Sequence, residues 1–433
     1  MITDTLQACE QYLSSAYGEP IHLTVRYNPH CFGRQLWGEV GGAKASWGKQ
    51  SNADEIVVLP RWQCLIDPQS QAARRFLQER VSAKWPPVAW AGRQYCNLLA
   101  ISSVRRMIVP WNLRAEPDLP SHPAPGTNVT GLGDLVLGDY TNRVKVFSFS
   151  EGRLLNLART PANHGPLRQE VRDRKAAIAW GVSVPPVLAS QEDGGWSLEP
   201  LVPGRPLRDL NNTTWPVVAS VFRELMGQYR GSGCSWVDGE TYLQDCLSTI
   251  WQAIPSTGPQ REAIAPLIAA VEEWLISIIS ACDRIAVTAI HGDFHLDNIL
   301  WDSKEAKAWL IDWEFSREGP VWADLYWLLA AWSRWRGAHL VWDWICKDPS
   351  LPIRHPNLEK MVDALERLAP RPTSLVGQAA HFGLVLLERC VATIERVGSQ
   401  GIHRPRMLPY LQSLLSLILE GRRRAPSTLM SVP

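Results

Sequence analysis

Two carboxylates and one amide lie close together in the sequence, each near the end of a stretch typical of a buried strand. Asp293 follows the apolar run at 285–290, and Asn298 lies five residues further on. Asp312 follows a second apolar run at 308–311. Such oxygens are the ligands that Mg²⁺ prefers, and a carboxylate can also take the proton of an attacking hydroxyl. These residue types therefore predict phosphoryl transfer from a nucleoside triphosphate.

The elements around these residues are predicted to form one hairpin-like unit. The two apolar runs are typical of short buried strands, and Asp302-Ser303-Lys304-Glu305 between them is a turn signal. Gly292 permits a backbone turn that other residues resist. We therefore expect Asp293, Asn298 and Asp312 to lie close together in the folded chain.

Three motifs in this stretch resemble the aminoglycoside phosphotransferase and choline kinase branch of the protein-kinase-like fold. Residues 291–298 read H-G-D-x-x-x-x-N, where protein kinases have H-R-D-x-x-x-x-N. Residues 311–314 read I-D-W-E, and residues 319–325 read G-x-x-x-x-D-L. One motif alone would be a weak signal, but three in the family's order and at matching intervals are a specific one.

The resemblance implies a role for each of these residues. ATP would be the phosphate donor and Mg²⁺ the cofactor. Asp293 would be the catalytic base, and Asn298 and Asp312 would be the metal ligands. Asp324 would sit on a buried helix and, with His291, would hold the catalytic loop in place.

The preceding part of the chain is predicted to form the β-rich N-lobe of this fold. We expect strands at 135–137, 143–149 and 154–158 and a helix at 166–180. The family pairs a lysine in the third strand with a helical glutamate fourteen residues later. Glu170 fits the glutamate, but Asn156 stands where the lysine is expected.

A cation for the nucleotide phosphates would then have to come from a nearby residue. The candidates are Arg143, Lys145 and Arg159. If the nucleotide faces Asn142, Val144 and Asn156, strand alternation turns all three candidates to the opposite side. Residues 199–207 resemble the family's hinge, which predicts adenine contacts at Glu199 and Leu201.

The fold class predicted for the whole chain is α+β. A bilobal protein-kinase-like domain would occupy 129–433, with the N-lobe at 129–203 and a helical C-lobe at 204–433. A linker rich in proline would occupy 119–128. A small α/β or α+β domain of unknown function would occupy 1–118, and it could recruit a protein partner. The C-lobe helices are expected at 214–229, 240–253, 260–280, 321–335, 357–369, 376–397 and 407–420.

Composition limits the class of protein. The 433 residues carry a formal net charge of +1, which provides no overall field for nucleic acid or anionic lipid. The nine cysteines include no C-x-x-C pair, which is typical of reduced thiols. No signal peptide is recognisable, and no apolar run is long enough for a transmembrane segment. We therefore expect a cytoplasmic protein.

The acceptor is predicted to be a small molecule with a hydroxyl group. From 351 to 433 the sequence has eleven Lys or Arg and six Asp or Glu, a balance of +5. This sign disfavours a polycationic aminoglycoside and favours a neutral or anionic compound such as a sugar or a glycan precursor. The sequence does not distinguish ATP from GTP.

Two other classes of function remain open at this stage. The first is a nucleotide-binding pseudokinase that serves as a scaffold, which the missing lysine favours. The second is a metal-dependent hydrolase. In it, His295 and Asp297 would complete a metal cluster with residues 291, 293 and 312.

Overall fold

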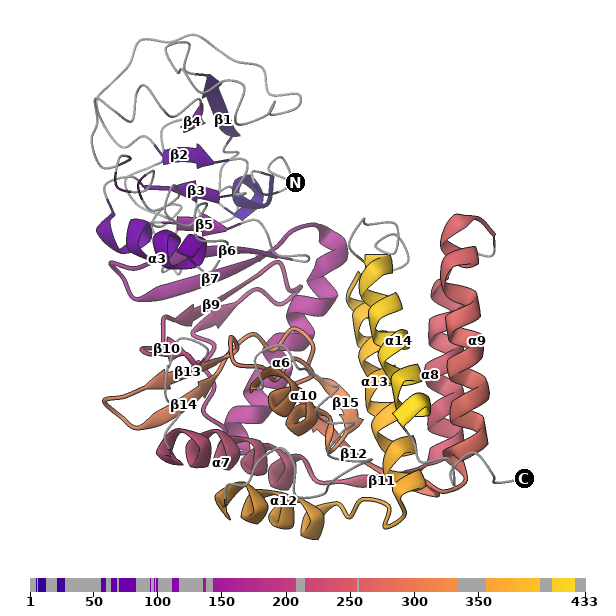
Figure 1. The fold of residues 1–433 in the computed structure, drawn as a ribbon. Helices are drawn as coiled ribbons and strands as arrows, with labels where there is room; N and C mark the ends of the chain where they lie inside the picture. The colour runs from indigo at the N-terminus through magenta and orange to yellow at the C-terminus, as the bar shows by residue number, and fades with distance from the viewer. Residues whose placement is uncertain are drawn as a thin grey trace. The chain divides into compact units, whose positions relative to one another are not determined.

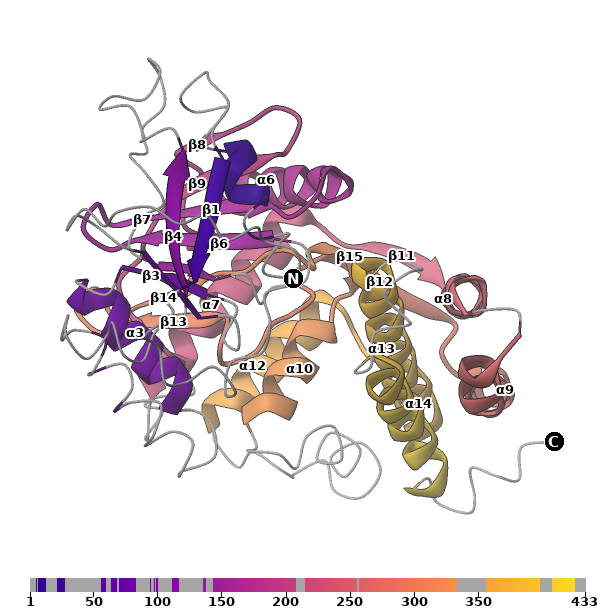
Figure 2. The same cartoon turned by 90° about the horizontal axis from the view of Figure 1, so that it is seen from above.

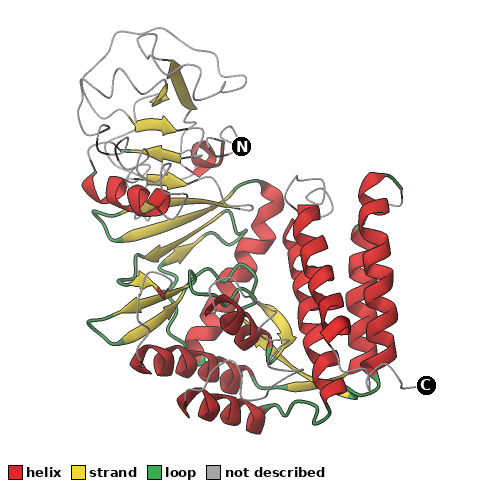
Figure 3. Cartoon of the chain, viewed as in Figure 1, coloured by secondary structure: helices red, strands yellow, loops and turns green. Residues whose placement is uncertain are grey.

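The computed structural model describes residues 5, 7–12, 22–27, 56–59, 64–67, 70–82, 94, 97, 99, 111–116, 135–137, 143–207, 215–254, 257–332, 356–397 and 407–424. In these residues strands predominate first and helices later, which confirms the predicted α+β class (Figures 1 and 3). The chain forms two compact units. Unit 1 contains 1–171 and 186–202, and unit 2 contains 172–185 and 203–433.

Unit 1 is built on a nine-stranded sheet whose adjacent strands are antiparallel. The strand order is β1-β4-β2-β3-β5-β6-β7-β9-β8. The strands are β1 (His22–Tyr27), β2 (Ile56–Leu59), β3 (Cys64–Ile66), β4 (Trp111–Glu116), β5 (Leu135–Leu137), β6 (Arg143–Ser148), β7 (Arg153–Ala158), β8 (Ala189–Ser190) and β9 (Trp196–Pro200). Strands β3, β4, β8 and β9 were not predicted from the sequence.

Strand β3 joins the first part of unit 1 to the later strands. It pairs with β5, so that Leu65 lies opposite Val136. Cys64 and Leu137 belong to one buried apolar cluster with Leu77 of α3 (Gln71–Ser82). The sheet is therefore continuous from residues before the predicted linker to residues after it. The linker at 119–128 lies outside the described residues, and the predicted domain boundaries stay a prediction.

Unit 2 contains two three-stranded sheets that carry the predicted catalytic stretch. One sheet has the order β11-β12-β15 and the other the order β10-β13-β14. The strands are β10 (Arg205–Pro206), β11 (Ser235–Asp238), β12 (Arg284–Ile290), β13 (Ile299–Asp302), β14 (Lys307–Leu310) and β15 (Arg317–Pro320). The turn signal at 302–305 is confirmed, because the Asp302 carboxylate accepts the backbone N–H of Lys304. The hairpin at this turn joins β13 to β14, however, while β12 pairs with β11 and β15 in the other sheet. The expected hairpin-like pairing of the runs at 285–290 and 308–311 was therefore wrong, because residues 299–302 form a strand of their own.

The predicted helices of unit 2 are present, with ends close to those expected. They are α7 (Trp215–Ser232), α8 (Gly239–Ala253), α9 (Pro259–Ile279), α10 (Ala323–Trp332), α12 (Pro356–Leu368), α13 (Leu375–Val397) and α14 (Met407–Arg424). Helix α6 (His164–Ala179) matches the helix expected at 166–180. Residues 333–335 of the predicted helix at 321–335 lie outside the described residues.

Four of these helices, α8, α9, α13 and α14, lie side by side (Figures 1 and 2). Helix α9 buries a stripe that includes Ile264, Ile268, Val271 and Leu275, whose spacing places them on one face. Among the described helices, only Leu375–Glu395 is long and apolar enough to cross a membrane. However, 78% of its apolar segment is buried inside the structure, as expected of a core helix.

Candidate active site

A fully buried carboxylate holds the loop that follows β12. Asp324, at the start of α10, accepts the backbone N–H of His291 at 2.8 Å and that of Gly292 at 3.0 Å. Burial raises the pKa of Asp324 to about 7, although both backbone hydrogen bonds oppose this shift. The loop is thus fixed at its first two residues by a helix that is distant in sequence.

The same loop requires glycine at position 292. Gly292 has φ +76°, and a Cβ atom there would lie 2.2 Å from the backbone oxygen of Phe315. Both the backbone conformation and the lack of space exclude a larger residue. The turn inferred from the sequence at this glycine is therefore confirmed.

The imidazole of His291 connects the loop to the residue before Asp312. Its Nε2 atom lies 3.0 Å from the backbone oxygen of Ile311, and its Nδ1 atom lies 3.4 Å from the backbone nitrogen of Asp293. The ring is buried and packs against Trp313. His291 therefore braces the two strand ends against each other.

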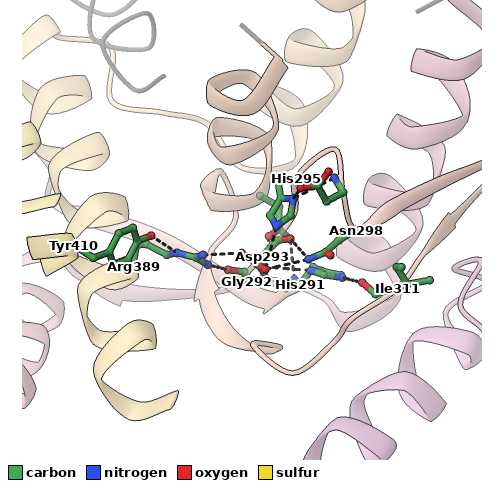
Figure 4. Close-up of polar contacts among 10 residues, drawn as sticks. His291, Gly292, Asp293, His295, Asn298, Ile311, Arg389 and Tyr410 are labelled. Carbon is green, nitrogen blue, oxygen red and sulfur yellow. Dashed lines mark hydrogen bonds and ion pairs between the residues drawn. The ribbon is translucent and has the colours of Figure 1, made fainter. Parts of the chain in front are cut away.

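Asp293 has hydrogen-bond partners on both carboxylate oxygens (Figure 4). Its Oδ2 atom lies 3.0 Å from Asn298 Nδ2 and 3.2 Å from His295 Nε2. Its Oδ1 atom lies 2.6 Å from Nη2 of Arg389, on α13. Burial opposes the charge on Asp293, but the His295 hydrogen bond and the Arg389 charge hold its pKa well below the usual range.

Asn298 and Asp312 have the chemistry that a magnesium ion needs. The Asn298 amide nitrogen donates to the backbone oxygen of Asp293 as well as to its carboxylate, which orients the amide and leaves its oxygen for a ligand. Ile311 donates its backbone N–H to Asn298 at 3.0 Å, and this contact brings Asp312 beside Asn298. Asp312 has φ +67°, a conformation uncommon outside glycine and often found at functional sites. One amide and one carboxylate fit Mg²⁺, which takes its remaining ligands from phosphate and water.

The described residues give less support to the alternative function of a metal-dependent hydrolase than to a magnesium-dependent phosphotransferase. Within them, no group of three or more His, Cys, Asp or Glu side chains is arranged to hold a metal ion. His295 lies within ion-pair distance of Asp293 and Asp297, at 3.2 and 4.0 Å. In the described residues, the cluster considered from the sequence therefore takes the form of two pairwise contacts of His295 and not of a metal site.

The four residues predicted to contact nucleotide from the N-lobe side all lie in unit 1. Asn156 is buried on β7, and its amide nitrogen lies 3.3 Å from Glu199 Oε1 on β9. The backbone N–H of Leu201 donates to the carbonyl of Gly152. Glu170, on α6, is buried and forms an ion pair of 2.5 Å with Arg143. The helical glutamate therefore has a cationic partner, although this partner is not on β7.

The strand alternation expected for this region was wrong for Arg143 and Lys145. Lys145 lies directly opposite Asn156, and Arg143 lies opposite Ala158. Residues directly opposite on antiparallel strands share a face of the sheet, so Arg143 and Lys145 are on the same face as Asn156. The expectation failed because it assigned faces by counting along the chain, whereas the relative faces of two strands depend on their register.

Arg389 is the site residue that sequence reasoning missed. Besides Asp293, its guanidinium donates to the backbone oxygen of Gly292, and its Nε atom lies 3.4 Å from the hydroxyl of Tyr410 on α14. The helix that carries it is far from the catalytic loop in sequence. A signal was nevertheless present, because Glu388 and Arg389 interrupt the apolar stretch LVLLERCVATI.

Comparison with known proteins decides the family. Residues 135–345 match the model of the phosphotransferase enzyme family. This part of the chain belongs to that family. The segment contains the loop around Asp293 and the residues that hold it, so the resemblance stated from the three motifs is confirmed. Membership in this family supports the function of a phosphotransferase that acts on small molecules.

No curated protein matches the chain, whereas many solved structures do. A protein from Ralstonia eutropha JMP134 described as an aminoglycoside phosphotransferase is 15% identical, with a TM-score of 0.45, and the match covers 67% of this chain and 92% of the other. A choline/ethanolamine kinase family protein from Mesorhizobium loti is 17% identical, with a TM-score of 0.37 and coverage of 69% and 88%. A macrolide 2'-phosphotransferase from Brachybacterium faecium is 14% identical, with a TM-score of 0.39 and coverage of 63% and 87%. Likenesses this distant say nothing about an acceptor for this chain.

Proposed function

We propose that the chain is an ATP- and Mg²⁺-dependent phosphotransferase that moves the γ-phosphate to a hydroxyl group of a small molecule. The observation that carries the proposal is the fixed position of Asp293. Its loop is held by Asp324, and its carboxylate is oriented by Asn298. Phosphoryl transfer depends mainly on positioning and charge, and the loop provides both.

In the proposed reaction, Asp293 accepts a hydrogen bond from the acceptor hydroxyl and takes its proton. The hydroxyl oxygen bonds to the γ-phosphorus while the bond from that phosphorus to the β–γ bridging oxygen breaks, and ADP leaves. Asn298 and Asp312 hold Mg²⁺, which neutralises charge on the phosphates when bound. His291 and Asp324 keep the loop in place and contact neither substrate.

Asp312→Ala is expected to weaken nucleotide binding in the presence of Mg²⁺ and to leave the weaker binding without Mg²⁺ unchanged. The variant removes the one carboxylate in the proposed pair of metal ligands. Titration calorimetry with ATP, with and without Mg²⁺, measures both affinities. Asp283→Ala, the same substitution at an exposed position immediately before β12, serves as the control. Equal loss of affinity with and without Mg²⁺ would contradict the assigned metal role.

We further propose that Arg143 supplies the phosphate-binding cation that Asn156 cannot. Arg143 and Glu170 reproduce the cation–glutamate pair of the family from the neighbouring strand, with side chains 3% and 4% exposed. Asn156 has no charge, and its amide already donates to Glu199. An arginine also binds phosphate through two parallel hydrogen bonds, which lysine does not offer.

Arg143→Gln is expected to weaken Mg²⁺–ATP binding about tenfold or more, because a charge-assisted contact to phosphate contributes about 1.5–3 kcal/mol. Lys145→Gln, at the other candidate cation on the same strand and face, shows whether Lys145 contributes to this affinity instead. Since either change alters a buried charge, thermal unfolding of each variant is recorded beside the calorimetry. Wild-type affinity in a folded Arg143→Gln variant would exclude Arg143 as the phosphate anchor.

The finer features of the function remain proposals. The net charge of +5 at 351–433 favours a sugar or glycan precursor over a polycation as acceptor. The composition favours a cytoplasmic protein. A pseudokinase would bind nucleotide but transfer no phosphate, so the same nucleotide titrations combined with an assay for transfer distinguish it from an enzyme.

A further inference from the structure

Two charged residues in the apolar middle of α13 face different neighbours. Glu388 pairs with Arg317 of β15 at 2.5 Å and accepts a hydrogen bond from Tyr242 of α8 at 2.7 Å. These contacts tie α13 to the surrounding strands and helices. Arg389 instead contacts the catalytic loop, and it is the cation that lies against Asp293 (Figure 4).

The guanidinium of Arg389 is held in one position by several contacts. Its two terminal nitrogens donate to Gly292 and Asp293, and its Nε atom donates to Tyr410. The carbon at its centre lies 4.9 Å from the ring centre of Phe315 and 5.3 Å from that of Trp327. Aromatic rings at these distances stabilise a cation and limit its motion. The charge next to Asp293 is therefore fixed before any acceptor binds.

Arg389 retains hydrogen-bonding capacity in this arrangement. A guanidinium has five N–H groups, and each of its terminal nitrogens carries two. One donor on each terminal nitrogen is used by Gly292 or Asp293. Within the described part of the chain, the second donor on each has no hydrogen-bond partner. The side chain is 13% exposed, and Tyr410 beside it is 39% exposed.

We propose that Arg389 selects an acceptor that carries a carboxylate or phosphate group close to its reacting hydroxyl. This inference rests on the proposed function, in which the hydroxyl meets Asp293. A hydroxyl at Asp293 brings the neighbouring atoms of the acceptor to the guanidinium, because Arg389 Nη2 is only 2.6 Å from Asp293 Oδ1. The planar donors of arginine match the oxygens of a carboxylate or a phosphate.

The charges around Arg389 favour an anion over a cation. The described part of α13 has two acids, Glu388 and Glu395, and both are paired with Arg317. They are therefore engaged elsewhere and leave Asp293 as the acid that contacts Arg389. A cationic acceptor would meet a fixed like charge beside the base, whereas an anionic one would share the guanidinium with Asp293.

The competing explanation is that Arg389 only clamps the loop to α13. A clamp would affect stability and the turnover rate for every acceptor equally. A specificity residue would instead affect affinity for the anionic member of a matched set. Glycerol, glycerate and glycerol phosphate form such a set, because they share a hydroxyl-bearing skeleton and differ in the charged group.

The test is titration of these three compounds into the full chain, followed by thermal unfolding and calorimetry, with and without Mg²⁺ and a non-hydrolysable ATP analogue. We expect the anionic compounds to bind and to stabilise the wild type, and glycerol to have no effect. Glycerate and glycerol phosphate distinguish carboxylate from phosphate as the preferred group. Failure of the analogue to bind would count against the proposed nucleotide function, and the titrations without analogue would still report on Arg389.

Arg389→Gln is expected to weaken binding of the preferred anion roughly ten- to a hundredfold, since it removes a charge-assisted contact. Arg389→Lys keeps the charge and is expected to restore part of this affinity. Arg371→Gln is the control, because Arg371 is also mostly buried, paired with an acid and stacked on a tryptophan. Equal binding of anionic and neutral compounds, or an anion preference unchanged in Arg389→Gln, would overturn the inference.

Discussion

Asp293→Asn is expected to reduce phosphoryl transfer by roughly a hundred- to ten-thousandfold, the range contributed by a positioned acid or base. The amide keeps the size of the side chain but cannot take the proton of the acceptor hydroxyl. Nucleotide affinity is expected to stay close to that of the wild type, because Asn298 and Asp312 remain. Transfer is measured as ADP release, and affinity is measured by calorimetry.

Two further measurements make this result specific. Asp283→Asn carries the same chemical change at an exposed position immediately before β12 and is expected to have wild-type activity. Asp293→Asn also leaves the buried Arg389 without its carboxylate partner, and removing one partner of a buried ion pair lowers stability. Thermal unfolding of the variant measures this loss of stability. Equal losses of nucleotide binding and transfer would show that Asp293 is not acting as a base.

Asp324→Asn is expected to destabilise unit 2 by about 1–3 kcal/mol and to abolish most transfer. The carboxylate of Asp324 accepts two backbone N–H groups, one from His291 and one from Gly292. Asparagine offers one acceptor oxygen, and its amide would place N–H against N–H at the other site. One buried donor would thus lose its partner, and the loop that carries Asp293 would shift.

Denaturant unfolding followed by tryptophan fluorescence measures this change in stability. Asp302→Asn is the matched control, since Asp302 also accepts backbone N–H groups, from Lys304 and Glu305, but within a local turn. That control is expected to unfold near the wild type and to retain transfer. Wild-type transfer by Asp324→Asn would show that the loop does not depend on this contact.

Much of the catalytic loop could be predicted because its determinants are local. Asp293 and Asp312 follow short apolar strands whose pattern can be recognised in the sequence, and Gly292 marks the turn after the first of them. Asn298 lies five residues after Asp293, immediately before β13. The hydrogen bonds from Asn298 to Asp293 and from Ile311 to Asn298 join residues that are near neighbours along the chain. The α+β class and most helix positions followed from the same kind of local pattern.

Other features could not be predicted because they depend on contacts between distant segments. The pairing of β6 with β7 decides which cation reaches Glu170, and its register is fixed by the folded sheet rather than by either strand alone. Arg389 reaches Asp293 from 96 residues away. Strand β3 is a short apolar segment, Cys64–Ile66, which has too few residues to show an alternating pattern.

Phosphorus NMR of Mg²⁺–ATP, incubated with the wild-type protein and a mixture of neutral and anionic hydroxyl compounds, tests the central claim most directly. The account predicts that the γ-phosphate signal is replaced by that of a phosphate monoester, and that Asp293→Asn prevents the replacement. If the folded wild type bound Mg²⁺–ATP but left the γ-phosphate in place, or released it only as inorganic phosphate, the assignment as a phosphotransferase would be contradicted.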